Sequence, residues 1–227
     1  MGRVKIKNLN YFIPRFRKIS ENGKLLVGLT GGIGSGKSTA LSVFAKKGFY
    51  TISSDEIVKE LLTLPYYCDI ILSRYPSVQD HCNVIDKTAL ARLIFSDIRA
   101  KRFVEGIIHP AVVLHILKKI KNAAEKAVVV EIPLLFETNL EQAFDIVVCV
   151  CCEREKVERR LVERGMRIWD VRARMKNQLD DRLRMMRSDA VISNNSDLRS
   201  FIKNVKEIAD VLEIFSLNKI YQMKNRY

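Results

Sequence analysis

The stretch GLTGGIGSGKST, residues Gly28–Thr39, holds five of the chain's ten glycines in its first nine positions. From Gly31 to Ser38 it matches the pattern G-x-x-x-x-G-K-[ST] at every fixed position. The apolar segment KLLVGLT (24–30) before it predicts a buried strand, and residues 37–47 after it have the apolar periodicity of a helix. A strand that enters such a loop and a helix that leaves it are the setting in which this pattern holds phosphates.

The residue types of this phosphate loop (Gly31–Ser38) explain its chemistry. Glycines let backbone N–H groups approach phosphate oxygens closely, and the N-terminus of the next helix adds the positive end of its dipole. We expect Lys37 to reach the β- and γ-phosphates and the Ser38 hydroxyl to ligate Mg²⁺. The predicted ATP-binding residues of this stretch are Gly32, Ile33, Gly34, Ser35, Gly36, Lys37, Ser38 and Thr39.

Apolar segments and helical patterns alternate along most of the chain, and this alternation predicts the fold class. The predicted strands are 24–30, 49–53, 128–132, 145–150 and 190–193, and the predicted helices are 37–47, 56–64, 88–95, 98–106, 110–124, 153–164, 171–186 and 198–212. Almost continuously apolar strands between helices indicate a parallel sheet covered on both faces. The prediction is an α/β fold with a doubly wound five-stranded parallel sheet and ligands at the carboxyl ends of the strands.

Composition narrows the class of protein. The 227 residues are 29% charged and 48% hydrophobic, as in a globular chain long enough to bury a core. The longest apolar runs are too short to span a bilayer. The five cysteines lack the paired spacing of a zinc site, so we favour a reducing, cytoplasmic compartment. We interpret Cys149, Cys151 and Cys152 as small buried residues rather than metal ligands.

The net charge of +13 lies mainly in two segments. Residues 1–24 carry seven basic residues and one acid, and residues 153–187 carry twelve basic and seven acidic residues. The first segment lacks the apolar core of a secretory signal, and we expect a disordered or loosely docked extension, with a mitochondrial presequence as the alternative. The second segment predicts a surface for a polyanion, and its near lack of aromatic residues argues against stacking on single-stranded nucleic acid.

Many classes of protein share a phosphate loop, and missing signatures exclude some of them. The chain has neither the D-x-x-G and N-K-x-D strings of regulatory GTPases nor the L-S-G-G-Q string of transporter ATPases. The class that remains is a small kinase that moves phosphate to an acceptor.

Two carboxylates are expected at the ends of predicted strands, where an acceptor would bind. Asp55 is expected to end the second strand, and a carboxylate there can take a proton from an acceptor hydroxyl. Asp55 can equally cap a helix that begins at Glu56. Glu131 follows three valines and would act on Mg²⁺ through water, because a buried acid needs such a partner.

Basic side chains offer a second set of candidates. Arg160 and Arg164 lie four residues apart, hence on one helix face, and a mobile lid that carries them would neutralise phosphate charge. Interleaved glutamates also fit a solvated, salt-bridged helix, so both interpretations stay open. His109 precedes Pro110, whose fixed φ suits the first position of a helix, and we expect His109 to mark a helix start.

Together these pieces resemble the dephospho-coenzyme A kinase family over about residues 26–212. The motifs that carry the resemblance are GLTGGIGSGKST, Asp55, IHP at 108–110, EIPLLFE at 131–137, Arg160 with Arg164, Arg174 with Gln178, and SDAVISNN at 188–195. The chain departs from the family pattern at Ser53, where a carboxylate is usual, and at Glu131, where aspartate is commoner.

The resemblance implies ATP-dependent phosphorylation of the ribose 3′-hydroxyl of dephospho-coenzyme A, with Asp55 as base, Lys37, Arg160 and Arg164 also catalytic, and Asn194 near the adenine. It implies a P-loop kinase domain (25–215) between a basic extension (1–24) and a tail (216–227), with acceptor-binding helices at about 56–125 and a lid at about 153–187. The expected acceptor-binding residues are Thr30, His109, Pro133, Leu134, Leu135 and Glu137.

Two alternative functions remain at this stage. The first is another small-metabolite, nucleoside or nucleotide kinase of the same fold. The second is an ATP-binding protein associated with nucleic acid, although we expect the partners to be the two small-molecule substrates without nucleic acid. The sequence leaves the oligomeric state open.

Overall fold

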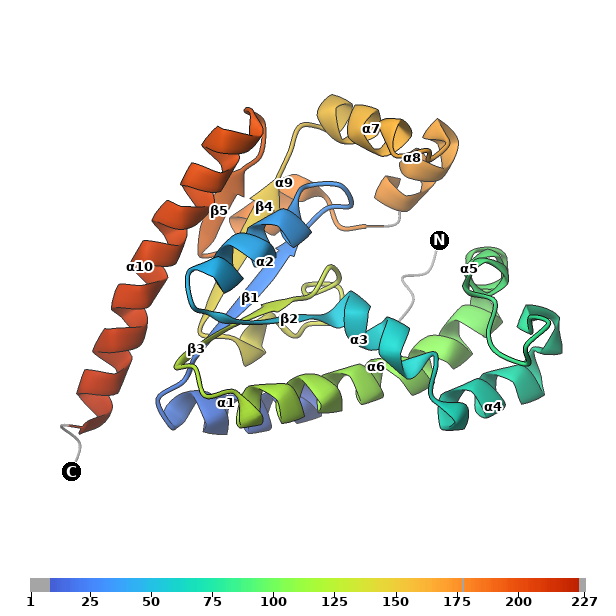
Figure 1. The fold of residues 1–227 in the computed structure, drawn as a ribbon, viewed down its shortest axis with the longest axis horizontal. Coiled ribbons are helices and arrows are strands. Elements are labelled where there is room, and N and C mark those ends of the chain that lie inside the picture. Colours follow the sequence, from blue (N-terminus) through green and yellow to red (C-terminus); the bar gives the residue numbers. More distant parts are fainter. Residues whose placement is uncertain (1–8, 177, 225–227) are drawn as a thin grey trace.

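A single parallel sheet forms the centre of the computed structural model, which describes residues 9–176 and 178–224 (Figure 1). Its strands pair in the order β2-β3-β1-β4-β5, and all four pairings are parallel. The strands are β1 (Leu25–Gly31), β2 (Tyr50–Ser53), β3 (Ala127–Glu131), β4 (Ile146–Cys151) and β5 (Ala190–Ser193). Each lies within a residue of its predicted position, and the α/β fold class with a five-stranded parallel sheet is confirmed.

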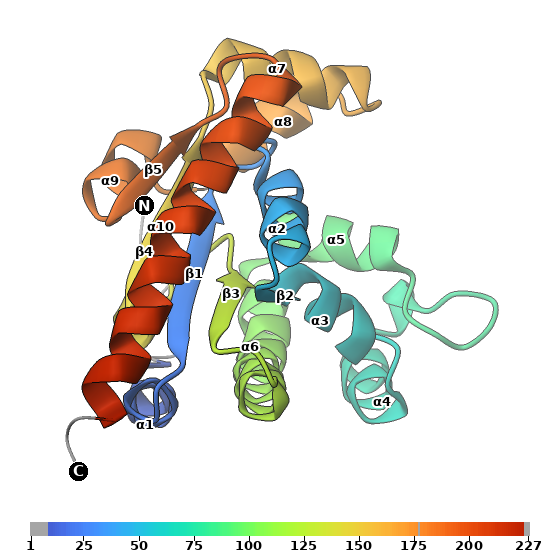
Figure 2. The same cartoon turned by 60° about the vertical axis from the view of Figure 1, so that its left-hand side comes forward.

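Helices cover both faces of the sheet, as Figure 2 shows. The helices of the described residues are α1 (Ile13–Glu21), α2 (Lys37–Lys46), α3 (Ser54–Leu61), α4 (Pro65–Arg74), α5 (Lys87–Ser96), α6 (Ile98–Asn122), α7 (Arg154–Glu163), α8 (Ile168–Lys176), α9 (Asp181–Met186) and α10 (Leu198–Lys224), with 3-10 turns η1 (Asn10–Phe12), η2 (Pro76–Val78) and η3 (Glu141–Ala143). Alternate strand residues point to opposite faces. Leu26 and Val128 join the core with α1 and α6, whereas Val27 and Val129 join the core with α2 and α10.

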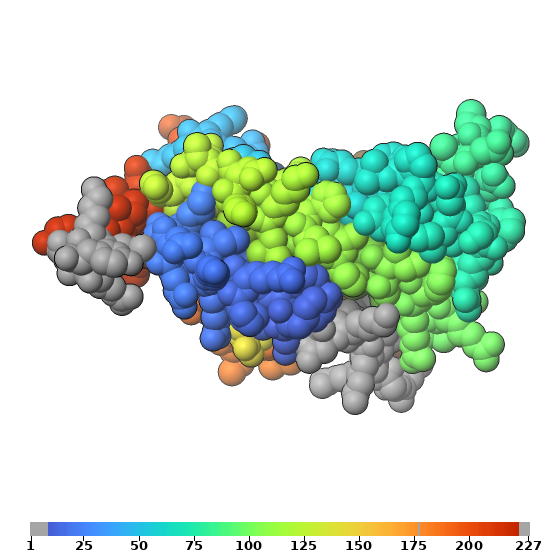
Figure 3. Space-filling model, turned by 90° about the horizontal axis from the view of Figure 1, so that it is seen from below, coloured from blue at the N-terminus to red at the C-terminus, as the bar shows by residue number. Residues whose placement is uncertain are grey.

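The N-terminal segment is part of the core, so the expected disordered or loosely docked extension is wrong for residues 9–24. Phe12 and Phe16 of this segment are almost fully buried. Figure 3 shows α1 lying along α6 on the surface of the molecule. Ser20 donates a hydrogen bond to the Asp145 carboxylate at 2.6 Å, and Lys219 of α10 pairs with the same carboxylate at 2.7 Å. Residues 1–8, the rest of that prediction, lie outside the described residues.

The long helix α6 corrects a second prediction, because it runs unbroken through the position where two helices were expected. Pro110 lies inside α6, so His109 does not mark a helix start. A proline within a helix costs roughly 3 kcal/mol, because it removes one hydrogen bond and its ring crowds the preceding turn. Val104, Ile108 and Val112 are buried along the same helix, and their burial offsets this cost.

Further boundaries also differ from the prediction. The helix expected at 171–186 is two helices, α8 and α9, because the Asp180 side chain accepts a hydrogen bond from Arg182 N and starts α9 anew. Helix α10 continues through the boundary expected at 215, so residues 216–224 are no separate tail. The sequence also missed α4.

No helix among the described residues is long and apolar enough to cross a membrane.

Candidate active site

The phosphate loop connects β1 to α2, as the sequence predicts, and Asn194 fixes its shape. Gly36 precedes α2 with φ of 108°, a conformation that favours glycine. The Asn194 side-chain amide donates a hydrogen bond to Ser35 O at 2.7 Å, and a Cβ on Gly36 would stand 2.3 Å from that nitrogen. Asn194 therefore supports the loop from behind. The place near the adenine that the family resemblance implies for Asn194 stays a prediction.

Lys37 begins α2 and is buried beneath the loop, with 8% of its surface exposed. Its ammonium group donates hydrogen bonds to Gly31 O at 3.0 Å and Gly32 O at 2.9 Å. Burial lowers the pKa of Lys37, and the carboxylates of Glu131 and Asp55 oppose that change. A buried ammonium group between loop carbonyls and two carboxylates can bind a polyanionic ligand.

The two predicted carboxylates lie near Lys37, one at the end of β3 and the other in the first turn of α3. Glu131 ends β3 with 5% of its surface exposed, and burial raises its pKa, whereas Lys37 and a hydrogen bond from Ser53 lower it. Asp55 lies one residue inside α3 and is exposed, so it neither ends the strand nor caps the helix; Ser53 holds the cap position. Asp55 is therefore open to solvent, and its role toward an acceptor stays a prediction.

Arg160 and Arg164, predicted together, point to different surroundings. Arg160 donates a hydrogen bond to Asn194 O at 3.1 Å and another to Cys152 Sγ at 3.3 Å. Arg164 follows the last residue of α7 and is exposed to solvent. Arg160 thus contacts Asn194, the residue that supports the phosphate loop.

Salt bridges within the lid favour the interpretation that its interleaved charges form solvated, salt-bridged helices. Glu158 pairs with Arg172 at 2.9 Å and with Arg154 at 3.1 Å. Hydrogen bonds from Arg172 and then Arg154 lower the pKa of Glu158. The bridge from Glu158 to Arg172 joins α7 to α8, so part of the arginine-rich segment serves the structure of the lid.

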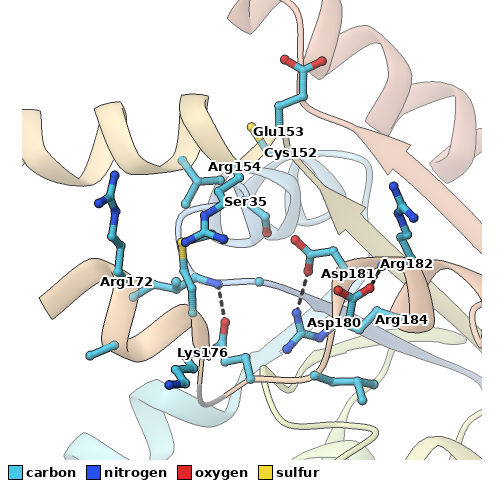
Figure 4. Close-up of a pocket in the computed structure, with 17 residues that line it drawn as sticks. Ser35, Cys152, Glu153, Arg154, Arg172, Lys176, Asp180, Asp181, Arg182 and Arg184 are labelled. Carbon is cyan, nitrogen blue, oxygen red and sulfur yellow. Dashed lines mark hydrogen bonds and ion pairs between the residues drawn. The ribbon is translucent and has the colours of Figure 1, made fainter. Parts of the chain in front are cut away.

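A cavity of about 1010 Å³ lies between the phosphate loop and the lid. Figure 4 shows the Ser35 hydroxyl and the Arg154 and Arg172 side chains around it. Gly32 lies on its wall, where an added Cβ would stand 3.2 Å from the Asp181 carboxylate. The cavity is thus closed on one side by the loop and on the other by α7, α8 and α9.

Sequence reasoning missed Arg184, the most buried charged side chain of this region, with 1% of its surface exposed. It donates hydrogen bonds to Asp181 at 2.7 Å and to Glu137 at 3.0 Å, and its charge lowers the pKa of Lys37. Glu137 also accepts a hydrogen bond from Leu179 N at 2.9 Å. Nothing in the local pattern sets Arg184 apart from the other arginines of residues 153–187, because only tertiary packing buries it.

The predicted acceptor-binding residues differ in how deeply they are buried. Leu135 is fully buried, and its side chain packs where a Cβ on Gly28 would lie. The buried Thr30 hydroxyl donates a hydrogen bond to Pro133 O at 3.4 Å. Pro133 and Leu134 are half-buried.

His109 lies on α6 and not in the phosphate loop. Its ring is half-buried, and its Nδ1 atom has no hydrogen-bond partner among the described residues. Burial, and then the charge of Lys101, lower the pKa of His109. The imidazole is therefore neutral near pH 7.

Comparisons with known proteins agree with this geometry. The family model described as dephospho-CoA kinase matches residues 25–200. A dephospho-CoA kinase of Corynebacterium glutamicum is 32% identical over 190 residues, which are 81% of this chain and 97% of that protein. The crystal structure of TT1252 from Thermus thermophilus has a TM-score of 0.74 at 27% identity, over 83% of this chain and 98% of that one.

A dephospho-CoA kinase from Campylobacter jejuni has the same fold, with a TM-score of 0.57 at 23% identity over 82% of this chain and 96% of that chain. The matched segment contains the phosphate loop, both carboxylates and the whole lid. The chain belongs to the dephospho-CoA kinase family.

Proposed function

We propose that the protein transfers the γ-phosphate of ATP to the ribose 3′-hydroxyl of dephospho-coenzyme A. The observation that carries the proposal is the grouping of Lys37, Glu131 and Asp55 at the carboxyl edge of the sheet, beside the phosphate loop. The loop and Lys37 bind the donor phosphates, and Asp55 faces the acceptor and takes its proton. Membership of the dephospho-CoA kinase family supports the choice of acceptor.

In the proposed reaction, residues of this chain hold the charges in place. Lys37 gives up its contacts with the loop carbonyls for the β- and γ-phosphates. Arg160 and Arg164 approach the transferred phosphoryl group when the lid moves. The walls of the acceptor site come from the loop after β3, with Pro133 and Leu134, while Thr30 and Leu135 support that loop from within.

The proposed cofactor ion is Mg²⁺. The exposed Ser38 hydroxyl supplies one oxygen ligand, and Glu131 reaches the ion through water. Within residues 9–176 and 178–224 no three His, Cys, Asp or Glu residues form a metal-binding group, and this sparse donor set fits Mg²⁺ held mainly by nucleotide phosphates and water. When bound, the ion neutralises charge on the phosphates.

A coupled kinase assay tests the proposal, with ATP as donor and dephospho-coenzyme A, adenosine and AMP as separate acceptors. We expect phosphorylation of dephospho-coenzyme A only, with the product's phosphate on the ribose 3′-oxygen by ³¹P NMR. Transfer to AMP without transfer to dephospho-coenzyme A would establish the alternative nucleotide kinase. Binding of nucleic acid with a steep salt dependence and no transfer would favour the other alternative.

The cellular location belongs to the same proposal. The five cysteines are free, which fits a reducing compartment such as the cytoplasm. Fluorescence microscopy of a C-terminal fusion protein tests it, because a diffuse signal supports the cytoplasm and mitochondrial fluorescence supports a targeting role for residues 1–24.

A further inference from the structure

Gln178 occupies part of the phosphate loop that a nucleotide would use. Its side-chain oxygen Oε1 accepts a hydrogen bond from Ile33 N at 3.0 Å. Ile33 is the third residue of the phosphate loop, and its N–H is one of those assigned above to ATP. An amide oxygen thus lies where a phosphate oxygen would otherwise accept the same hydrogen.

Gln178 belongs to a segment of the lid that is anchored to the core. We call residues 178–184 the hinge strap; it includes the first residues of α9. Glu137, from the loop after β3, holds the strap through Leu179 N at 2.9 Å and through Arg184 at 3.0 Å. Gln178 therefore contacts the phosphate loop from a segment that Glu137 holds in place.

Polar groups along the cavity lack partners that an anionic ligand would supply. The Ser35 Oγ and Arg184 Nε atoms are buried and have no hydrogen-bond partner among the described residues, and both residues line the cavity next to Gln178. Leaving a buried polar group unpaired costs about 1–3 kcal/mol. The cavity is therefore shaped for a ligand rich in hydrogen-bond acceptors and donors, and Gln178 satisfies only one of its groups.

We propose that Gln178 competes with the nucleotide for the Ile33 N–H, so that ATP displaces the Gln178 side chain and removes one contact between the lid and the phosphate loop. The proposal rests on the function proposed above only in taking ATP as the ligand. A neutral hydrogen bond contributes about 0.5–1.5 kcal/mol, so removing the competing side chain should tighten ATP binding by about 2- to 12-fold. Gln178 is then a positioning residue that sets nucleotide affinity and links it to the lid.

Three variants of the full chain test this with ATP as the probe, measured by isothermal titration calorimetry. Gln178→Ala should bind ATP about 2- to 12-fold more tightly than the wild type. Gln178→Glu should bind it more weakly than the wild type, because a carboxylate keeps the Ile33 contact and repels the phosphates. Gln79→Ala is the matched control: it also loses one side-chain hydrogen bond, to Asn83 at 2.9 Å, on an exposed loop, and its affinity should equal that of the wild type.

The single tryptophan gives a second readout, because Trp169 lies in the lid and is 60% exposed. ATP should change its emission in the wild type, and Gln178→Ala without nucleotide should already move toward the bound value. Far-UV circular dichroism checks that each variant is folded. Weaker or unchanged ATP binding by a folded Gln178→Ala overturns the inference. Absence of ATP binding to the wild type overturns the proposed function instead, so the two failures are distinguishable.

Discussion

The buried charge of Arg184 allows a quantitative prediction. Arg184→Met removes both hydrogen bonds of the guanidinium and leaves the Glu137 carboxylate, 18% exposed, without its cation. Removing one partner of a buried ion pair costs about 3–5 kcal/mol, because the remaining charge stays desolvated. Since Asp181 is 40% exposed and can be hydrated, we expect the lower end, about 3 kcal/mol. For a chain of this size that lowers Tm by about 6–12 °C.

Urea unfolding measures this free energy, and Arg172→Met is the control. Arg172 also makes two hydrogen bonds to one carboxylate, that of Glu158 at 3.1 and 2.9 Å, but its side chain is 59% exposed. Its loss should cost much less than the loss of Arg184, because water screens the pair and Glu158 keeps its salt bridge with Arg154. Equal losses in the two variants would show that burial does not set the strength of the Arg184 contacts. In Glu137→Gln/Arg184→Met, where no ionised Glu137 remains, part of the lost stability should return.

Three further predictions concern catalysis, the N-terminal segment and pH. Asp55→Asn should keep the wild-type Kd for ATP while kcat falls by about two orders of magnitude or more. Lys37→Ala should lose both ATP affinity and turnover. If Asp55→Asn lost as much ATP affinity as Lys37→Ala, Asp55 would have a structural role. Phe16→Ala should lower the free energy of unfolding by about 3–5 kcal/mol in urea, because Phe16 is 1% exposed; a loss under 1 kcal/mol would mean that α1 is loosely docked. Because the pKa of His109 is lowered in the folded state, the unfolded chain binds more protons, and the free energy of unfolding falls as the pH drops below about 6.5 toward the folded pKa. His109→Asn should remove this part of the pH dependence, measured by thermal unfolding at pH 7 and pH 5. The same change in Tm between the two pH values in variant and wild type would contradict the prediction.

The local sequence was sufficient for the sheet and for the donor half of the site. Strands β1, β3 and β4 are runs of valine, leucine and isoleucine that are buried on both faces, so their pattern is visible in any short window. The phosphate loop is recognisable from a short window as well, because its glycines and the start of α2 are adjacent in the chain, although the distant Asn194 supports its shape. Asp55 and Glu131 were found for the same reason: each follows a recognisable strand.

Only the tertiary structure decided which charges are buried and which helices continue. Pro110 reads as a helix start in isolation, and the apolar contacts of α6 on both sides of it override that preference. Phe12 and Phe16 occur in a basic segment that looks like an extension, yet the sheet and α6 provide the apolar surface that covers them. Arg184 and Gln178 lie more than 140 residues from the phosphate loop, and no local pattern records that contact. The sequence thus determined the strands, helices and loop that are specified by residues within one turn or strand. The tertiary structure decided the features that are stabilised by contacts between residues distant in the chain.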